Sequence, residues 1–249
     1  MPRLSVNLNK IALLRNSRRT GIPDVVRFGR IAHDAGADGL TVHPRPDERH
    51  IRRGDVLALA ELMRPWQPGF ELNIEGYPDQ RLLDLVARIR PEQCTLVPDA
   101  PGVLTSEEGW KLGPEERALV VPAVAALTEI GARVILFVDP DPAVVERVRD
   151  AGADGIEIYT GGYAAGFRAG AADARLQDCA ATAARAVELG LLVNIGHDLN
   201  LDNLPPLVAA LPGVAEASIG HELTADALVM GFADAVRAYR AALGAGAAA

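Results

Sequence analysis

The amino-acid sequence predicts an α/β fold, a (β/α)8 TIM barrel in which residues 1–249 form a single domain. Short strand-like segments recur along the chain with helical periodicity between them, which is typical of repeated βα units. A chain of 249 residues also has the length that eight such units need. A doubly wound open sheet is the alternative, but no G-x-G-x-x-G motif follows the first strand.

Eight segments have the composition of buried strands. They lie at residues 4–7, 39–43, 70–75, 93–97, 133–138, 155–159, 191–194 and 215–219. Four of them, the second, fifth, sixth and seventh, follow a helical segment that ends in glycine and leads directly into the strand. The hexapeptide DAGADG occurs twice in this role, at 34–39 and 150–155. Glycine adopts the left-handed conformation without strain, so these positions mark helix ends.

Two segments interrupt the alternation and are predicted to be extra helical or loop segments after strands one and four. Residues 11–20 include Arg15 and Arg19, which we interpret as solvated charge, and residues 99–114 include Trp110 among small and polar residues. Long loops at the strand ends of barrels are commonly lids or binding loops. The Ala/Gly-rich tail, about residues 241–249, is expected to fray.

Composition narrows the class of partner and the compartment. The net charge of −8 argues against nucleic acid or an anionic membrane as the main partner. No apolar run approaches bilayer length, and the N-terminus leads directly into a strand, so no membrane attachment is expected. Cys94 and Cys179 lack metal-site spacing and suit core thiols in a reducing compartment. The sequence therefore predicts a cytoplasmic protein with small-molecule partners.

Polar side chains alternate with apolar ones in strands that should be buried on both faces. The pattern is clearest in the third strand, where Glu71, Asn73 and Glu75 alternate with leucine and isoleucine, and it recurs at Glu157. The apolar set belongs against the outer helices, so the polar set points into the barrel. Buried carboxylates are costly unless they are paired. The expected partners are side chains at the same rim of the barrel: His43, Arg45, His197 and His221.

Ligands bind at the carboxyl ends of barrel strands, and three such ends carry suitable residues. The loop HPRPDERH, at 43–50, follows the second strand and holds two histidines and two arginines. Gly196 and His197 follow the seventh strand, and Gly220 and His221 follow the eighth. Barrels commonly bind phosphate after these last two strands, where glycine lets backbone N–H groups approach an anion. The sequence therefore predicts two anion sites.

These residues make the chain resemble the pyridoxine 5′-phosphate synthase family. The matching stretches are VNLNKIALLRNSR (6–18), AGADGLTVHPRPDERHI (35–51), LNIE (72–75), LVP (96–98), GIEIYTGGYA (155–164), VNIGHDL (193–199) and IGH (219–221). They follow one another along nearly the whole chain. The resemblance implies a (β/α)8 barrel that assembles as a homo-octamer and needs no metal or organic cofactor. The implied reaction condenses 3-amino-2-oxopropyl phosphate with 1-deoxy-D-xylulose 5-phosphate, releasing phosphate and water.

The resemblance also implies a role for each matching residue. Four of them would act in catalysis: His43 as proton acceptor, Glu75 as a second acid/base, His197 as proton donor and Glu157 as stabiliser of transition-state charge. Arg45, His50 and Thr105 would bind the sugar phosphate, and Asn7, Arg18, Gly220 and His221 the aminoketone phosphate, with Arg18 serving its own or a neighbouring subunit. Asn9, Lys10 and Asp198 complete the substrate-binding set, standing where the family commonly has Asp, His and Gly.

The residue types suit the implied chemistry. Ring closure with loss of water needs serial proton transfers, which histidine and a carboxyl of raised pKa perform near neutral pH. Two rival functions stay open: a Schiff-base aldolase that uses Lys10, and a non-catalytic phosphate-binding barrel. A metallohydrolase with His43, Glu75 and His197 as ligands is disfavoured by their wide spacing.

Overall fold

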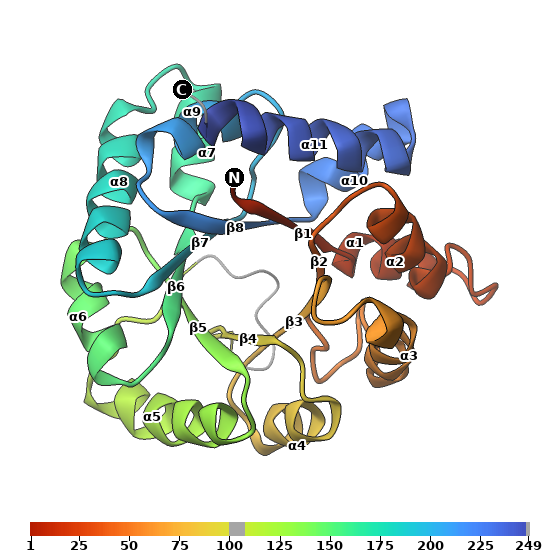
Figure 1. Ribbon diagram of the computed structural model, residues 1–249, viewed down its shortest axis with the longest axis horizontal. Helices are drawn as coiled ribbons and strands as arrows, with labels where there is room; N and C mark the ends of the chain where they lie inside the picture. The colour runs from red at the N-terminus through yellow and green to blue at the C-terminus, as the bar shows by residue number, and fades with distance from the viewer. Residues whose placement is uncertain (100–107, 248–249) are drawn as a thin grey trace.

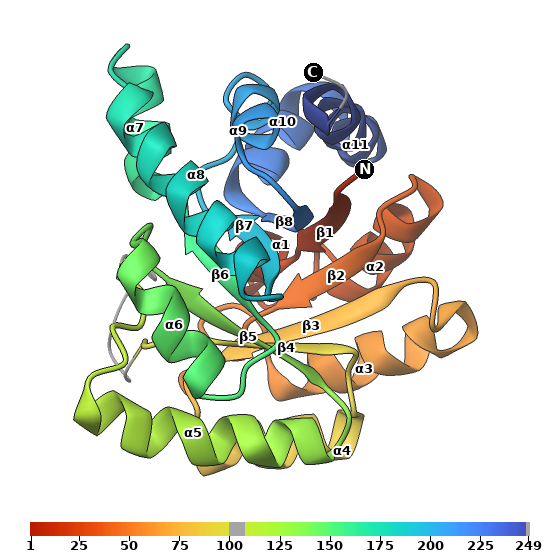
Figure 2. The same cartoon turned by 60° about the vertical axis from the view of Figure 1, so that its left-hand side comes forward.

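The computed structural model describes residues 1–99 and 108–247. Eight parallel strands close into a barrel in sequence order, and helices surround it (Figure 1). The turned view shows the same helices lying outside the strands (Figure 2). The predicted (β/α)8 barrel is therefore confirmed, and the alternative of an open doubly wound sheet is wrong.

Each predicted strand overlaps an observed one. The strands are β1 (Arg3–Asn7), β2 (Gly39–Val42), β3 (Glu71–Gly76), β4 (Gln93–Leu96), β5 (Arg133–Val138), β6 (Gly155–Tyr159), β7 (Leu192–Gly196) and β8 (Val214–Ile219). The helices are α1 (Asn9–Asn16), α2 (Val25–Asp34), α3 (Arg53–Met63), α4 (Gln80–Ile89), α5 (Pro114–Glu129), α6 (Pro142–Asp150), α7 (Gly161–Arg168), α8 (Asp173–Glu188), α9 (Leu204–Ala210), α10 (His221–Met230) and α11 (Phe232–Ala247), with the 3₁₀ helix η1 (Arg64–Trp66) after α3.

The predicted extra segment after β1 is present, whereas residues 100–107 of the one predicted after β4 lie outside the described residues. The segment after β1 forms the extra helix α1, and the described residues between β4 and α5 form no helix. The chain end differs from the prediction, because α11 continues to Ala247 and buries Leu243 completely. A short Ala/Gly-rich segment is only marginally stable as a helix on its own, and its apolar contact with the rest of the protein stabilises the helix.

The backbone structure explains the residues found at three positions of the repeated DAGADG motif. In the first copy, Gly36 has a φ of 93°, which ends α2. The Asp38 carboxylate accepts a hydrogen bond from the Leu4 N–H at 2.9 Å, and so ties the turn to β1. A Cβ at Gly39 would lie 2.6 Å from the Glu71 carbonyl oxygen, so only glycine lets β2 approach β3 there. The second copy, before β6, repeats all three features.

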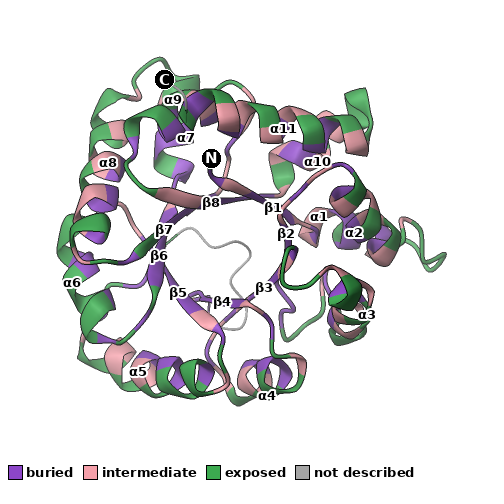
Figure 3. Cartoon of the chain, viewed as in Figure 1, coloured by how far each residue is buried: buried purple, intermediate pink, exposed green. Residues whose placement is uncertain are grey.

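The barrel strands are largely buried (Figure 3), and their polar side chains bond to one another across the inside of the barrel. In the middle of the barrel Ser5 and Thr41 share a hydrogen bond of 2.6 Å, and Thr95 donates to Asn73 at 3.1 Å. These bonds satisfy buried groups without any charge. The predicted inward direction of the polar set is confirmed.

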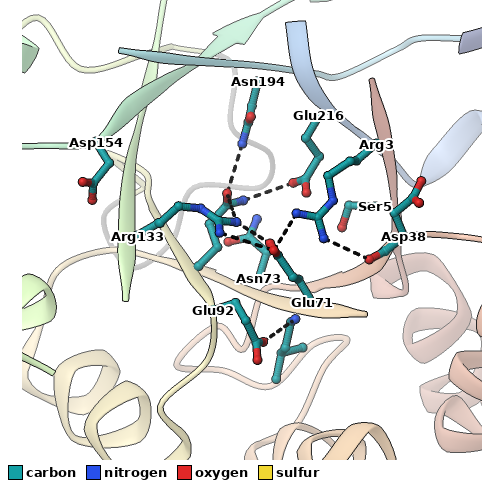
Figure 4. A network of polar contacts seen from close by, with 12 residues as sticks. Arg3, Ser5, Asp38, Glu71, Asn73, Glu92, Arg133, Asp154, Asn194 and Glu216 are labelled. Atoms are coloured by element: carbon teal, nitrogen blue, oxygen red, sulfur yellow. Dashed lines mark hydrogen bonds and ion pairs between the residues drawn. The ribbon is translucent and has the colours of Figure 1, made fainter. Parts of the chain in front are cut away.

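The prediction that all the inward-facing strand carboxylates lie at one rim of the barrel is wrong for Glu71. It lies at the amino ends of the strands, where Arg3 donates to it at 2.5 Å and Arg133 forms a second ion pair (Figure 4). Beside this group, Gln93 donates to Glu216 at 3.1 Å. Glu71 thus belongs to a structural ion network at the mouth of the barrel opposite the predicted site.

Glu216 makes the stability of this network depend on pH. Burial raises its pKa to about 7, whereas an unfolded glutamate has a pKa of about 4.3. The folded state therefore binds more protons between these values, and this contribution to stability is lost as pH rises through 7. We expect Glu216→Gln to raise the free energy of unfolding by about 2 kcal/mol more at pH 8 than at pH 5. Urea unfolding at the two pH values measures this, and an equal effect at both would contradict it.

Candidate active site

A cavity of about 600 Å³ opens at the carboxyl ends of the strands. Twelve of the predicted site residues line it: Asn7, Asn9, Lys10, His43, Arg45, His50, Glu75, Glu157, His197, Asp198, Gly220 and His221. The structure thus brings together residues from both halves of the chain at one mouth of the barrel, as the sequence predicted. Of the other two, Arg18 lies exposed in the turn after α1 and does not line the cavity, and Thr105 lies outside the described residues.

His43 and Glu75 stand next to each other at the ends of β2 and β3. The distance from His43 Nδ1 to Glu75 Oε2 is 4.0 Å, and Asn7 Nδ2 lies 3.4 Å from the same oxygen. Burial raises the pKa of Glu75 to about 7, and the nearby Asp99 carboxylate adds to this. Burial lowers the pKa of His43 well below its usual value, as does the charge of Arg45. Near neutral pH, His43 is therefore an uncharged base beside a carboxyl that can give or take a proton.

Asn9 fixes the position of His43 from the start of α1. Its side-chain oxygen accepts the His43 backbone N–H at 2.9 Å, and its own N–H donates to Asn7 Oδ1 at 3.0 Å. The bond to His43 needs only an oxygen acceptor, which an asparagine supplies without adding a negative charge to the cavity. The end of β2 is thus held by β1 and α1 together.

The loop after β2 brings cations and a neutral histidine to the cavity. Arg45 is buried and forms an ion pair with Asp99. His50 Nδ1 accepts the Ile51 N–H at 2.9 Å, so the ring proton sits on Nε2. Burial lowers the His50 pKa to about 4, with a further contribution from Arg45. At neutral pH His50 is therefore a hydrogen-bond donor, while Arg45 and Lys10 supply positive charge for an anion.

Glu157 stands on the opposite wall, at β6. It is 3% exposed, and its Oε2 has no hydrogen-bond partner among the described residues. Burial raises its pKa well above the usual value, which favours the protonated form, and that form can donate a hydrogen bond into the cavity. A Cβ at Gly196 would overlap Glu157 Oε1. The sequence had indicated Gly196 only for anion approach, and the structure shows that it also makes room for this carboxyl.

His197 follows Gly196 in a strained backbone conformation with a φ of 80°. Its ring packs against two aromatic rings that also contact each other, with centroid distances of 5.2 Å to Phe137 and 5.3 Å to Tyr159. This packing restricts the orientation of the imidazole, which lines the cavity. Tyr159, which the sequence pattern placed on the inward face of its strand without naming it a site residue, also lines the cavity.

The region after β8 combines an expected anion site with carboxylates. Gly220 precedes the N-terminus of α10, and a Cβ there would lie 3.1 Å from the Asn7 Cβ. Glu222 and Asp198 line the same cavity, and the pKa of Glu222 is raised by burial and by Asp198. The sequence analysis missed Glu222, although it follows the IGH stretch directly. Two carboxylates beside a phosphate site suit a substrate that also carries an ammonium group.

Within 1–99 and 108–247, no three His, Cys, Asp or Glu side chains are grouped so that they could hold a metal ion. No helix in these ranges is long and apolar enough to cross a membrane.

Comparison with known proteins decides the family. The model for "Pyridoxal phosphate biosynthesis protein PdxJ" matches residues 4–245. The chain belongs to the PdxJ family. This PdxJ chain is 49% identical over 242 residues to the pyridoxine 5′-phosphate synthase of Albidiferax ferrireducens, covering 95% of each protein. It is 51% identical to the protein of the same name from Brucella suis, covering 97% of this chain and 98% of the relative. PdxJ relatives this similar are enzymes, and so is this chain.

Solved structures at low identity share the fold of this PdxJ protein. A tryptophan synthase from M. tuberculosis has a TM-score of 0.63 at 16% identity, covering 98% of this chain and 92% of that one. A 4-hydroxy-2-oxoglutarate aldolase has a TM-score of 0.57 at 18% identity, with 96% and 93% covered. Identities this low support the barrel fold alone.

Proposed function

We propose that this PdxJ protein is a pyridoxine 5′-phosphate synthase that condenses 3-amino-2-oxopropyl phosphate with 1-deoxy-D-xylulose 5-phosphate. The observation that carries the proposal is the convergence of His43, Glu75 and His197 on one cavity with Glu157. Relatives about half identical over almost their whole length carry this enzyme's name. Phosphate and water are the other products.

The charge states of the buried groups support serial proton transfer. Neutral His43 removes a proton from substrate, and Glu75, with a pKa near 7, relays protons in either direction. His197 donates a proton to a leaving oxygen as water departs. Protonated Glu157 donates a hydrogen bond where negative charge develops. Each group thus has one role in joining the amine to the ketone and closing the ring.

Two anion sites on different walls suit two phosphorylated substrates. Arg45 and His50, with Lys10 in the same cavity, would hold the sugar phosphate. Gly220 and His221 would hold the aminoketone phosphate, with its ammonium group facing Asp198. Fixing both reactants in one cavity supplies on the order of 7 kcal/mol of the barrier.

The other expected properties are proposed together with the function. We propose a single-domain cytoplasmic protein that works as a homo-octamer without metal or organic cofactor. Arg18 is exposed at the end of α1, and it would reach aminoketone phosphate by movement of its own turn or from a neighbouring subunit. Thr105 would complete the sugar-phosphate site.

The decisive experiment supplies purified protein with both substrates and no added metal. The expected result is formation of pyridoxine 5′-phosphate, which is monitored by the absorbance of the product. Covalent labelling of Lys10 after borohydride treatment with a phosphorylated sugar would instead support the aldolase. Binding of both phosphates without turnover would support a non-catalytic barrel.

A further inference from the structure

The last turn of α1 contacts the loop at 43–50 from outside the cavity. Arg15, interpreted from the sequence as solvated, is only 7% exposed. Its guanidinium forms a bidentate ion pair with Asp55, with 2.5 Å from Nη1 to Oδ1 and 2.8 Å from Nη2 to Oδ2. The same Nη2 donates to the backbone carbonyl of His50 at 3.1 Å. A buried arginine therefore joins α1, α3 and the end of this loop.

Asn16 adds a second set of bonds to the same loop. Its Nδ2 lies 3.3, 3.0 and 2.8 Å from the backbone carbonyl oxygens of Glu48, Arg49 and His50. Its Oδ1 accepts from Arg15 Nε at 3.0 Å, which fixes the orientation of the amide. Three consecutive carbonyls are thus directed toward one side-chain amide. This arrangement holds the loop backbone rather than its side chains.

Asp55 completes the group. Besides Arg15, its Oδ2 accepts the Arg52 backbone N–H at 2.8 Å, at the start of α3. The carboxylate therefore caps α3 and anchors the guanidinium at once. We call Arg15, Asn16 and Asp55 the α1 clamp.

The α1 helix holds the loop at both of its ends. At its first residue, Asn9 binds the His43 backbone N–H, and at its last turn the α1 clamp binds the His50 carbonyl. His50 has its Nδ1 occupied by the Ile51 N–H, so the position of its backbone determines where Nε2–H points. Its ring centroid lies 6.0 Å from that of His43.

We infer that Arg15 and Asn16 are positioning residues for one substrate only, because they set the backbone that carries Arg45 and His50 against a phosphate. The identity of that substrate as the sugar phosphate rests on the proposed function. Neither residue lines the cavity, so neither touches substrate. Of the proposed aminoketone phosphate groups, Asn7, Gly220 and His221 make no hydrogen bond to the α1 clamp in the described residues, and Arg18 is exposed in the turn beyond it.

The test measures the KM of each substrate for Asn16→Ala and Arg15→Lys. Asn16→Ala removes the amide without leaving a charge unpaired, and Arg15→Lys keeps the charge but loses the bidentate geometry. We expect each to raise the KM for the sugar phosphate about 10-fold, while the KM for the aminoketone phosphate changes less than about 2-fold. Far-ultraviolet circular dichroism checks that each variant is folded.

Arg240→Lys is the matched control. Arg240 Nη1 contacts Asp38 Oδ2 at 2.5 Å and the Gly36 carbonyl at 2.6 Å, which is the same combination of carboxylate and backbone oxygen at the other end of the barrel. Both KM values should stay unchanged in this variant. Folded clamp variants with both KM values raised equally, or with neither changed, would overturn the inference.

A binding readout separates this inference from the proposed function. The chain has five histidines, so the ring signals of His50 can be assigned by NMR with a His50→Gln variant. Inorganic phosphate is expected to shift the His50 signals in the unmodified protein. In Asn16→Ala, the same shift should require a phosphate concentration about 10-fold higher. This result in a protein without synthase turnover would reject the proposed function and support the clamp. An unaltered phosphate titration in Asn16→Ala would reject the clamp, whatever the enzyme makes.

Discussion

His43→Ala and Glu75→Gln are each expected to lower turnover by about 100-fold or more while the protein stays folded. His43→Ala removes the neutral base, and Glu75→Gln replaces the titratable carboxyl with an amide that does not titrate near neutral pH. His43 is buried and Glu75 nearly so at the cavity end of the barrel, and among the described residues Glu75 makes one long hydrogen bond, to Asn7. Turnover is measured as pyridoxine 5′-phosphate formed per enzyme, and thermal melting checks the fold.

Glu216→Gln is the matched control for Glu75→Gln. Both carboxyls have a pKa raised to about 7 by burial, but Glu216 lies at the amino ends of the strands, bonded to Gln93. We therefore expect Glu216→Gln to change stability and to leave turnover within about 2-fold. Similar losses of turnover in the two variants would show that burial of charge, and not position at the cavity, determines the rate.

The pH dependence of the rate follows from the same pair. Because the Glu75 pKa lies at about 7 and the His43 pKa is lowered, the kcat/KM profile should change near pH 7 with Glu75 and stay insensitive to His43 there. The change near pH 7 should persist in Glu216→Gln. If the residual activity of Glu75→Gln still shows the change in kcat/KM near pH 7, that change belongs to another titrating group.

The fold was predictable from the sequence because its determinants are local. The glycines that end the four helical segments of the pattern, as at Gly36 and Gly152, have the positive φ that the pattern implied. Alternation of polar and apolar residues fixed which side chains point into the barrel. It did not determine how far along the barrel axis each side chain lies. Glu71 and Glu75 have the same parity but lie four residues apart in β3, roughly 13 Å along the strand, so they reach opposite mouths.

Site residues that directly follow a strand were predictable from the sequence. Residues whose role depends on partners distant in the sequence were less so. His43 and His197 follow their strands directly. Arg15 is buried because Asp55, forty positions away, pairs with it, and no local pattern contains that information. The double role of Gly196 depends on the side chain of Glu157 in the neighbouring strand, which is likewise a tertiary contact.

Gly196→Ala is expected to lower turnover by about 100-fold through a single added methyl group. The methyl would overlap Glu157 Oε1 and displace the carboxyl from the cavity wall. The φ of Gly196 is not positive, so alanine fits the backbone of β7 without strain. Gly113→Ala is the control, since a Cβ there meets nothing within 4 Å. It should leave turnover unchanged.

A double variant separates displacement of Glu157 from any other effect of the methyl group. Glu157→Asp withdraws the carboxyl by one methylene and so makes space for the alanine Cβ. If Gly196→Ala acts by displacing Glu157, the double variant should be no slower than Glu157→Asp alone, a strong departure from additivity. A double variant slowed by the product of the two single losses would mean that Gly196 acts independently, through backbone approach to an anion, and that the position of the Glu157 carboxyl does not limit the rate.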